Sequence, residues 1–545
     1  MENPVKHNLS LYLLLISVCT FFVHPDVIPV SIMEARNFIT SREMLTENHW
    51  LLTTLNNVPR YQKPPLPSWI GSIFGAILGY NNIIAYRLPT AIMASLMVIC
   101  WCKLSSRISE NPQTGIMSAL IFSTSFYTYI IQREAPTDIY THGFMLAAIY
   151  QLFIFFRQDN NLYKHSLIAA LFWGLSFLSK GPISLYALFL PFIISYGFIY
   201  RFREMKKRIL PLIIFIVAGT VIGFWWFIYV KYADPHNLMA VAKRETDNWT
   251  SYNMRPFYYY WSFFTQTGIW TIPALLSLFY PYLKDRVSNK KAYTFSFIWT
   301  LAAVLLLSVI PEKKSRYLFP VLVPLALNTA FYIEYIVSRF HEFKKLAEKI
   351  PVYLTFGLIG LIALAVPAGL YIFVLKTAAL PYLWAVLFSA GCLLSGILIL
   401  TGLFRKQLNN SFTGTIAFIV VAICLGLPLA KTVYTDLPIK ELRAEINDKH
   451  QNTYIFGEHS PELIWIYGKV IPPVTAGAEI ERSLPASFKM LVTLSAFPDF
   501  QKKFEKGFMI KELNAVDLNY TSKKGRKGYK DRLVSKLFLL RKRDR

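Results

Sequence analysis

Apolar runs of about 20 residues alternate with short polar connections over the first 430 residues of the chain. A helix that crosses a bilayer needs about 20 consecutive, predominantly apolar residues. We therefore expect an all-α polytopic membrane protein with thirteen transmembrane helices. The predicted spans are residues 9–24, 87–103, 113–131, 137–156, 164–180, 182–199, 209–230, 259–281, 292–311, 317–338, 351–375, 379–402 and 413–430. No small-residue cleavage site follows the first run, which favours a retained anchor over a removed signal peptide.

Residues 66–80 are apolar but short for a crossing, and an extra crossing would invert everything downstream. The basic residues indicate whether the number of crossings is odd or even, because cytoplasmic loops are enriched in Lys and Arg. They occupy every second connection: Lys103/Arg107, Arg157/Lys164, Arg201 to Arg208, Lys284 to Lys291, Arg339 to Lys349 and Arg405/Lys406. With thirteen spans and a cytoplasmic amino terminus, all six connections lie inside. We therefore predict residues 66–80 to be a juxtamembrane helix on the outer interface.

This topology divides the chain into two domains. Residues 1–431 form the multi-span domain, with a long first external loop at 25–86 that contains juxtamembrane helices. Residues 432–545 form a small soluble α/β domain on the outer side, in the periplasm. Its predicted strands are the β-type runs Thr453–Phe456, Leu463–Tyr467 and Lys489–Leu494.

The composition fits a membrane protein rather than an ordinary soluble enzyme. Apolar residues make up 54% of the chain and charged residues only 16%, whereas soluble domains carry about 25% charge. The net charge of +25 lies mostly in the short loops, where bilayer orientation explains it, so no nucleic-acid partner is expected. The five cysteines lie in or beside apolar runs and suggest neither a disulfide framework nor a metal site.

The ionisable residues gather at the outer rim of the predicted spans rather than within them. Ionisable groups at a membrane face are candidates for function. The candidates are Glu34, Arg36, Arg60, Lys63, Asp138, Lys180, Arg255, Lys314 and Arg316. Cations there could neutralise a phosphate leaving group, and a carboxylate could position or deprotonate an acceptor. The pattern therefore suits group transfer from a lipid-linked phosphate.

Each candidate also has a structural explanation. Ser31 and Glu34 form a capping-box pattern that could simply start a helix running to about Asn48. Asp138 and Lys180 lie at the ends of spans, where the helix dipole favours an acid at the start and a base at the end. Lys63 is harder to explain structurally, because the two following prolines extend the chain and fix where the ammonium points.

His142 lies one turn into the span that Asp138 opens. A buried imidazole whose hydrogen bonds are satisfied is favoured there over a metal ligand.

Several motifs together resemble a known family. They are Met33-Glu34-Ala35-Arg36-Asn37-Phe38, Ser41-Arg42-Glu43-Met44-Leu45, Tyr61-Gln62-Lys63-Pro64-Pro65-Leu66, Arg87-Leu88-Pro89, Pro136-Thr137-Asp138, Leu178-Ser179-Lys180-Gly181-Pro182, Arg255-Pro256-Phe257-Tyr258-Tyr259 and Lys314-Ser315-Arg316-Tyr317-Leu318-Phe319-Pro320. In order and placement they resemble the bacterial aminoarabinose transferases that modify lipid A. Those enzymes belong, with the protein O-mannosyltransferases, to the GT-C class of membrane glycosyltransferases.

The resemblance covers about residues 25–330 and implies a function. A sugar carried on a polyprenyl phosphate, usually undecaprenyl phosphate, would be transferred with inversion on the outer face of the bacterial inner membrane. Lipid A would be the acceptor. The resemblance implies that Lys63 contacts the donor phosphate and that Asp138 lies at the reacting centre. It also implies that Lys180, Lys314 and Arg316 are further phosphate or acceptor contacts. In or beside the same motifs, we expect these residues to bind substrate as well: Arg36, Arg60, Tyr61, Arg255 and Tyr317.

Two departures from the family pattern affect the chemistry. Met33 stands where the family has Asp, so only Glu34 of an acidic pair remains. This loss is tolerable for a phosphate acceptor, which is already anionic at pH 7, whereas a hydroxyl acceptor would need Glu34 or Asp138 as its base. Gln62 replaces the acidic residue before Lys63, so we expect no required metal cofactor.

Two other functions remain open. Within the same enzyme class, the acceptor could be a protein Ser or Thr or a growing glycan. From another class, the chain could be a flippase or transporter of a lipid-linked sugar. Transporters bind near the bilayer midplane with broken helices in related halves. The rim charges and long outer loop favour transfer over transport.

Overall fold

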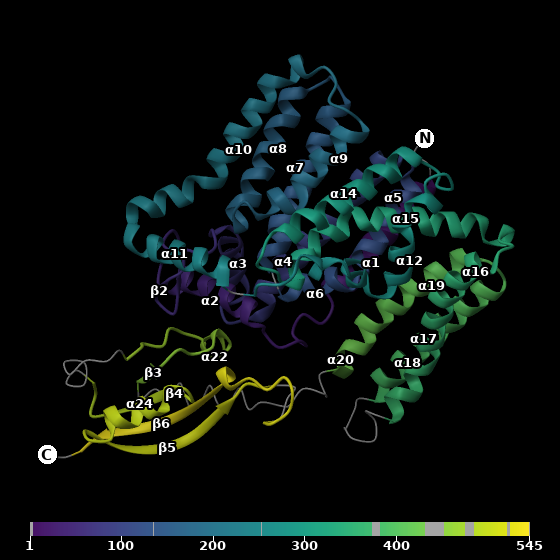
Figure 1. Cartoon of the computed structure of the whole chain (residues 1–545). Coiled ribbons are helices and arrows are strands. Elements are labelled where there is room, and N and C mark those ends of the chain that lie inside the picture. Colours follow the sequence, from purple (N-terminus) through teal and green to yellow (C-terminus); the bar gives the residue numbers. More distant parts are fainter. Residues whose placement is uncertain are drawn as a thin grey trace. The chain divides into compact units, whose positions relative to one another are not determined.

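The computed structural model describes residues 4–134, 136–251, 253–372, 382–430, 452–474, 484–519 and 524–543 (Figure 1). The chain forms two compact units. The first, here the helical unit, comprises Met1–Val27, Tyr61–Pro67 and Arg87–Leu429. The second, here the mixed unit, comprises Ile28–Arg60, Ser68–Tyr86 and Ala430–Arg545. The predicted first external loop is thus shared between the two units.

The helical unit follows the predicted apolar runs closely. Its helices are α1 (Pro4–Phe21), α4 (Ile83–Ser109), α5 (Pro112–Ser123), α6 (Phe126–Glu134), α7 (Pro136–Arg157), α8 (Leu162–Lys180), η1 with α9 (Leu185–Phe189, Leu190–Ile199), α10 (Met205–Ala233), α11 (Pro235–Ser251), α14 (Lys290–Val309), η4 with α15 (Ser315–Val321, Leu322–Arg339), η5 (Phe340–Glu342), α16 with η6 and α17 (Leu346–Val352, Tyr353–Gly357, Leu358–Leu370), α18 (Tyr382–Phe404), and α19 with η8 and α20 (Leu408–Val421, Ala422–Gly426, Leu427–Ala430).

Eight helical segments among the described residues are long and apolar enough to cross a membrane. Helices α5 and α6 together make a ninth candidate, bent by 54° between them. Three more of the predicted spans are helical but do not meet these criteria, namely α1, α8 and the η1–α9 segment. The structure is therefore that of a predominantly helical, multi-pass membrane protein.

The predicted span at residues 259–281 is wrong as a continuous helix. The chain instead forms η2 (Phe257–Tyr260), η3 (Phe263–Trp270), α12 (Thr271–Ser277) and α13 (Tyr280–Leu283). Gly268 breaks the helix with φ 68° and ψ −113°, a conformation that glycine adopts without strain. Nearby, the indole of Trp270 donates a hydrogen bond of 2.9 Å to Thr124 Oγ1. Hydropathy alone did not reveal this break.

Helix α8 packs against both α7 and α10, and small residues allow the close approach to α10. A Cβ at Gly219 would lie 3.1 Å from the carbonyl oxygen of Ala170, and one at Gly174 would lie 2.5 Å from Ile222. Small residues at helix contacts are typical of membrane proteins, because they let the backbones approach.

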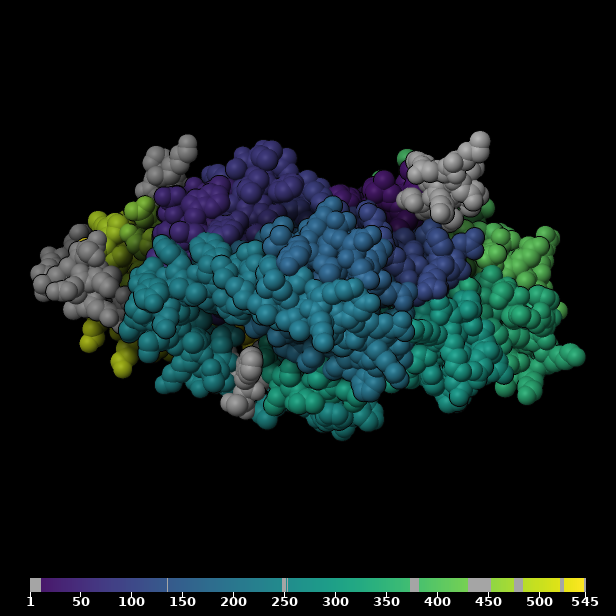
Figure 2. Space-filling model, turned by 90° about the horizontal axis from the view of Figure 1, so that it is seen from above, coloured from purple at the N-terminus to yellow at the C-terminus, as the bar shows by residue number. Residues whose placement is uncertain are grey.

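In Figure 2, helices α16 to α19 form a green group at one end of the helical unit, apart from the blue helices α7 to α9.

The mixed unit contains a four-stranded sheet in the order β3-β4-β6-β5. Its strands are β3 (Thr453–Phe456), β4 (Ser487–Thr493), β5 (Phe508–Asp517) and β6 (Val534–Lys542), and the helix α24 (Phe497–Phe504) connects β4 to β5. Strands β3 and β4 are parallel, whereas β6 is antiparallel to both of its neighbours. The strands predicted at Thr453–Phe456 and Lys489–Leu494 are thus confirmed.

Two hydrophobic layers cover this sheet, because side chains alternate between its faces along each strand. On β4, Met490 and Val492 face a cluster that includes Phe500 and Phe504 of α24. Leu491 faces the opposite cluster, which is formed with α22 (Pro461–Tyr467) and α2 (Ile32–Thr46).

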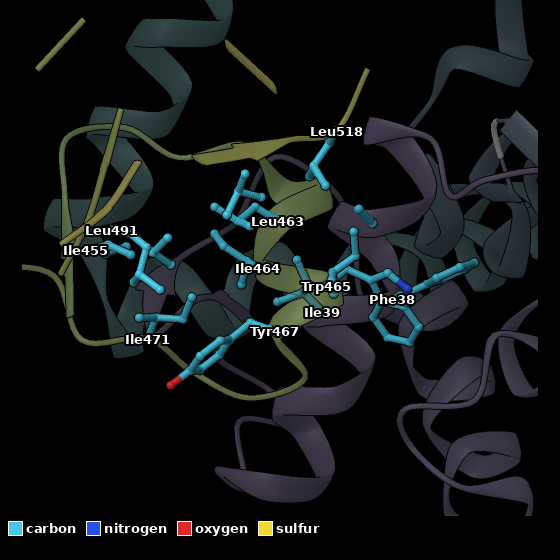
Figure 3. Close-up of a cluster of buried hydrophobic side chains, with 14 of the residues drawn as sticks. Phe38, Ile39, Ile455, Leu463, Ile464, Trp465, Tyr467, Ile471, Leu491 and Leu518 are labelled. Carbon is cyan, nitrogen blue, oxygen red and sulfur yellow. The ribbon is translucent and has the colours of Figure 1, made fainter. Parts of the chain in front are cut away.

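In the second layer, the rings of Phe38 and Trp465 meet edge to face at 5.3 Å between centroids (Figure 3). Phe38 also stacks on Tyr86 at 4.7 Å. The first external loop and the C-terminal sheet therefore share one hydrophobic core.

The strand predicted at Leu463–Tyr467 is wrong, because these residues form α22. Ser460 caps the helix by accepting a hydrogen bond from Leu463 N, and Pro461 takes the first helical turn. Gly468, at φ 91°, ends it in the left-handed conformation. These start and stop signals outweigh the β propensity of the apolar residues between them.

Two buried charges of α2 organise the loop within the mixed unit. The fully buried guanidinium of Arg42 donates to the carbonyl oxygens of Ile464 (3.2 Å) and Trp465 (3.4 Å) near the end of α22. The fully buried carboxylate of Glu43 accepts hydrogen bonds from Thr54 Oγ1 and Asn56 N, each at 2.6 Å. It holds the turn between the short strands β1 (Thr54–Leu55) and β2 (Val58–Pro59). The helix α3 (Leu66–Leu78) follows, as predicted for residues 66–80.

We expect Glu43→Gln to destabilise the mixed unit. The amide keeps the shape but replaces an acceptor oxygen with an NH₂ group, and hydrogen bonds to a charged group contribute about 1.5–3 kcal/mol each. The thermal unfolding midpoint of the purified protein should fall by several degrees, and protease cleavage near residues 54–59 should accelerate. Glu47→Gln, which alters an exposed carboxylate at the end of the same helix, is the control. Equal midpoints for the two variants would contradict the role given to Glu43.

Candidate active site

Helices α7 and α8 bring Asp138 and Lys180 together. The two helices pack side by side through a short connection at residues 158–161, so the start of α7 lies beside the end of α8. Asp138 lies in the first turn of α7 and Lys180 is the last residue of α8. Their side chains form a salt bridge and are each 4% exposed. The sequence predicted that Asp138 starts one helix and that Lys180 ends the next. The packing of the two helices brings these two side chains together.

The ring of Tyr317 lies at the centre of several cations. Lys180 Nζ lies 5.3 Å from the ring centroid, Lys314 Nζ 5.8 Å and the guanidinium carbon of Arg316 5.8 Å. Distances below 6 Å permit cation–π attraction, which is stronger where water is excluded. The motif Lys314–Pro320 thus supplies both two cations and an aromatic ring that stabilises them.

Two motifs far apart in the sequence are joined by backbone pairing. Met254 pairs with Glu312 as an antiparallel bridge, and Tyr260 Oη donates to the carbonyl oxygen of Lys314 at 3.1 Å. Arg255 is exposed, with its guanidinium 5.9 Å from the ring of Tyr259. The aromatic segment after Arg255 therefore supports the backbone that carries Lys314 and Arg316.

Lys63 is half-buried and lies within electrostatic range of the same cluster. Burial lowers the pKa of Lys63 to about 7, and the positive charges of Lys180 and Arg316 also lower it. The carboxylates of Asp138 and Glu245 oppose this shift in pKa. A lysine with such a pKa gains from an additional negative charge near its ammonium.

The charges of the cluster do not balance internally. Lys180 pairs with Asp138, and Lys314 forms a salt bridge with Glu312. Within the described part of the chain, neither Lys63 nor Arg316 forms a salt bridge, and the buried Nε of Arg316 has no hydrogen-bond partner. Buried cations are normally paired. The arrangement can therefore hold an anion, and charge-assisted hydrogen bonds to a phosphate would satisfy both side chains.

Sequence reasoning missed the local partners of these residues. Glu312, whose carboxylate forms a salt bridge with Lys314, is not among the predicted site residues. Sequence reasoning also predicted a satisfied imidazole at His142. The imidazole is buried, as expected, but among the described residues its Nδ1 has no hydrogen-bond partner. Its ring edge instead meets Phe319, with centroids 5.9 Å apart. The sequence does not show which side chains surround the buried imidazole or which carboxylate pairs with Lys314. No signal in the sequence could therefore have predicted these two contacts.

Three predicted site residues lie in the mixed unit. Glu34 closes the capping box with Ser31, accepting a hydrogen bond from Ser31 N at 3.0 Å, so its structural role is confirmed. Arg36 is exposed. Arg60 donates hydrogen bonds to Thr40 Oγ1 at 2.9 Å and Asn37 Oδ1 at 3.2 Å. Burial, with the nearby Arg36, lowers the pKa of Arg60 to about 10. Contacts of these residues with a substrate stay a prediction.

Across the described residues, no group of three or more His, Cys, Asp or Glu side chains is arranged to hold a metal ion. Two carboxylates of the cluster, Asp138 and Glu312, are instead engaged by lysines.

Comparison with known proteins identifies similar sequences. A family model described as dolichyl-phosphate-mannose-protein mannosyltransferase matches residues 62–226. A Photorhabdus laumondii protein named undecaprenyl phosphate-alpha-4-amino-4-deoxy-L-arabinose arabinosyl transferase is 24% identical over 451 residues, which cover 78% of this chain and 77% of the relative. An uncharacterized Aquifex aeolicus protein is also 24% identical, over 302 residues that cover 54% of this chain. The chain spans only 57% of the length of that second relative.

A solved structure shares the fold. The crystal structure of ArnT from Cupriavidus metallidurans bound to undecaprenyl phosphate matches with a TM-score of 0.67 and 14% identity, covering 99% of this chain and 98% of that one. The resemblance predicted from the motifs is confirmed: the chain resembles the aminoarabinose transferases and has the fold of a GT-C membrane glycosyltransferase.

The buried salt bridge predicts the effects of substitutions at Asp138 and Lys180 on stability. Removing one partner leaves an uncompensated buried charge, which costs about 3–5 kcal/mol. We expect Asp138→Asn and Lys180→Met each to lower the thermal unfolding midpoint. The double variant should be more stable than the less stable single variant, because no charge is left unpaired. Additive losses in the double variant would contradict a direct interaction between the two side chains.

Proposed function

We propose that this protein is a glycosyltransferase that moves a sugar from a polyprenyl phosphate donor to a lipid acceptor. One observation carries the proposal: Lys63 and Arg316 lie in a cluster of cations, and neither forms a salt bridge with a carboxylate among the residues that the structure describes. A phosphate group fits this imbalance. The names of the arabinosyl transferase relatives and the undecaprenyl phosphate bound to ArnT support the choice of a lipid-linked phosphate.

In the proposed reaction, the bond between the anomeric carbon of the sugar and the donor phosphate oxygen breaks. Its electron pair stays on that oxygen, so the leaving polyprenyl phosphate gains one negative charge. Lys63 and Arg316 stabilise this developing charge, as preorganised cations do in a site with little water. The acceptor oxygen attacks the opposite face of the anomeric carbon, which inverts the configuration. Lys180, held by Asp138, keeps a further cation beside the reacting centre.

A phosphate of lipid A is the proposed acceptor. Such a phosphate is already anionic at pH 7 and needs no general base to attack. This requirement fits a site in which Asp138 is engaged by Lys180 and Met33 offers no carboxylate. In the balanced reaction the acceptor phosphate becomes a diester and loses one negative charge, while the leaving phosphate gains one.

The proposed topology follows from the basic loops. The thirteen apolar segments, including the broken one at residues 259–281, would cross the inner membrane with the amino terminus in the cytoplasm. The ends of α7 and α8 that carry Asp138 and Lys180 would then face outward, and residues 432–545 would lie in the periplasm. Cysteines introduced at positions 63 and 290 should be labelled from opposite sides of the membrane, position 63 from the periplasm and position 290 from the cytoplasm.

We expect Lys63→Ala to lower transfer by about 10²- to 10³-fold, because removal of one preorganised group that stabilises a developing negative charge costs about 3–4 kcal/mol. Mass spectrometry of lipid A from cells producing each variant, with an assay for released polyprenyl phosphate, measures this loss. Lys290→Ala, which breaks an exposed salt bridge with Asp285, is the matched control and should transfer normally.

Three outcomes would count against the proposal. Near-normal transfer by Lys63→Ala would remove that residue from the mechanism. A sugar found on protein or glycan, with lipid A unchanged, would overturn the proposed acceptor. Movement of labelled donor across vesicles without cleavage would identify a transporter instead.

We also propose that transfer needs no divalent metal. Lysines already engage Asp138 and Glu312, and Gln62 offers no negative charge beside Lys63. Purified protein treated with EDTA and then dialysed should keep its rate within about two-fold, a change worth less than 1 kcal/mol in the barrier. Loss of activity that Mg²⁺, Mn²⁺ or Zn²⁺ restores would overturn this part of the mechanism.

A further inference from the structure

A hydrogen bond fastens the segment that carries Lys63 to the junction between α10 and α11. The hydroxyl of Tyr61 donates to Asp234 Oδ2 at 2.7 Å. Tyr61 is only 3% exposed, and its ring meets that of the fully buried Trp226 edge to face, with centroids 6.2 Å apart. The side chain is thus held at both its ring and its hydroxyl.

Asp234 is itself fixed by the start of α11. Its Oδ1 accepts a hydrogen bond from Asn237 N at 3.3 Å, and both of its carboxylate oxygens accept from Asn237 Nδ2. Its own amide donates to Val230 O at 2.8 Å, which ends α10. Figure 1 shows α11 leaving α10 in a new direction at this point. The carboxylate therefore caps α11 and receives Tyr61 at the same time.

This fastening acts two residues before Lys63. On the other side of Lys63, Pro64 and Pro65 are buried and restrict the backbone. The residue is held between a pinned tyrosine and a rigid proline pair. Helix α11 also carries Glu245, which is half-buried while its neighbours Arg244 and Thr246 are exposed, and whose negative charge acts on Lys63.

We propose that Asp234 is a positioning residue that, through its hydrogen bond to Tyr61, keeps Lys63 within electrostatic range of the Asp138–Lys180 pair. The proposal rests on the proposed function, because it assigns a purpose to the placement of Lys63. It also gives Tyr61 a supporting role in place of a direct contact with substrate. Misplacing a catalytic group by about 1 Å can cost about 10²-fold in rate.

Tyr61→Phe removes the hydrogen bond and leaves the ring in place, whereas Asp234→Ala removes the acceptor. We expect each variant to lower kcat/KM by about 10- to 10²-fold. The double variant should lose no more than the worse single variant, because the two changes break one interaction. Asp234→Asn keeps an acceptor oxygen and should recover part of the loss.

A pH profile separates positioning from simple loss of folded protein. The groups acting electrostatically on Lys63 are Lys180, Asp138, Glu245 and Arg316. Burial holds the pKa of Lys63 at about 7, so the protonated, active form is lost as the pH rises through that value. If the segment is released to water, this pKa rises toward its ordinary value. The alkaline limb of kcat/KM should then move to higher pH in Tyr61→Phe, while its maximum falls.

Tyr529→Phe is the matched control, since Tyr529 Oη donates to Asp517 Oδ2 at 2.8 Å within the mixed unit. It should change neither the rate nor the pH profile. A wild-type rate for Tyr61→Phe, or a lower rate with an unmoved alkaline limb, would overturn the positioning role. Loss of transfer in Lys63→Ala with a wild-type rate in Tyr61→Phe would overturn the positioning role alone. Movement of labelled donor across vesicles without cleavage by the wild-type protein would overturn the proposed function, so the two failures are distinguishable.

Discussion

The cost of removing like charges from water governs the candidate site. Lys63, Lys180, Lys314 and Arg316 belong to one cluster, and burial weakens the hydration that normally stabilises the charges of Lys63 and Lys180. Two of the four are neutralised locally, Lys180 by Asp138 and Lys314 by Glu312. The remaining positive charge is compensated most directly by an anion that binds from outside the protein. This imbalance is the reason that we propose a substrate carrying a phosphate.

Polar side chains around the cluster form hydrogen bonds that fix the backbone segments carrying its cations. The aromatic segment at residues 257–260 supports the backbone just before η4 through two hydrogen bonds between Tyr260 and the backbone of Lys314. Tyr61 and Asp234 do the same for the Lys63 segment. Both tyrosines are buried, so water cannot compete with their hydrogen bonds. The long, flexible side chains of Lys63 and Lys314 therefore extend from backbone segments whose positions are fixed.

In the mixed unit, buried charged side chains also fix the backbone, but there they stabilise the fold. Arg42 and Glu43 are adjacent on α2 and both are fully buried, but their hydrogen bonds go to the backbone of α22 and of the β1–β2 turn. Arg42 joins a segment near the amino terminus to one more than 400 residues later, whereas Glu43 holds a turn that follows within 14 residues. The motif that contains them is therefore explained by the folding of the unit, whereas the Lys63 motif is explained by the electrostatics of the cluster.

The sequence by itself determined the membrane class, the positions of most helices, the Ser31–Glu34 capping box and two of the strands. These features depend on local apolar length, on caps and on alternation, all of which are legible over a few residues. Only the tertiary structure decided that Gly268 breaks an apolar run, that residues 463–467 are helical, and that Asp138 pairs with Lys180. It also decided that Tyr61 is pinned by Asp234, 173 residues away. Such pairings depend on how distant helices pack, and no local pattern encodes the neighbour that packing supplies.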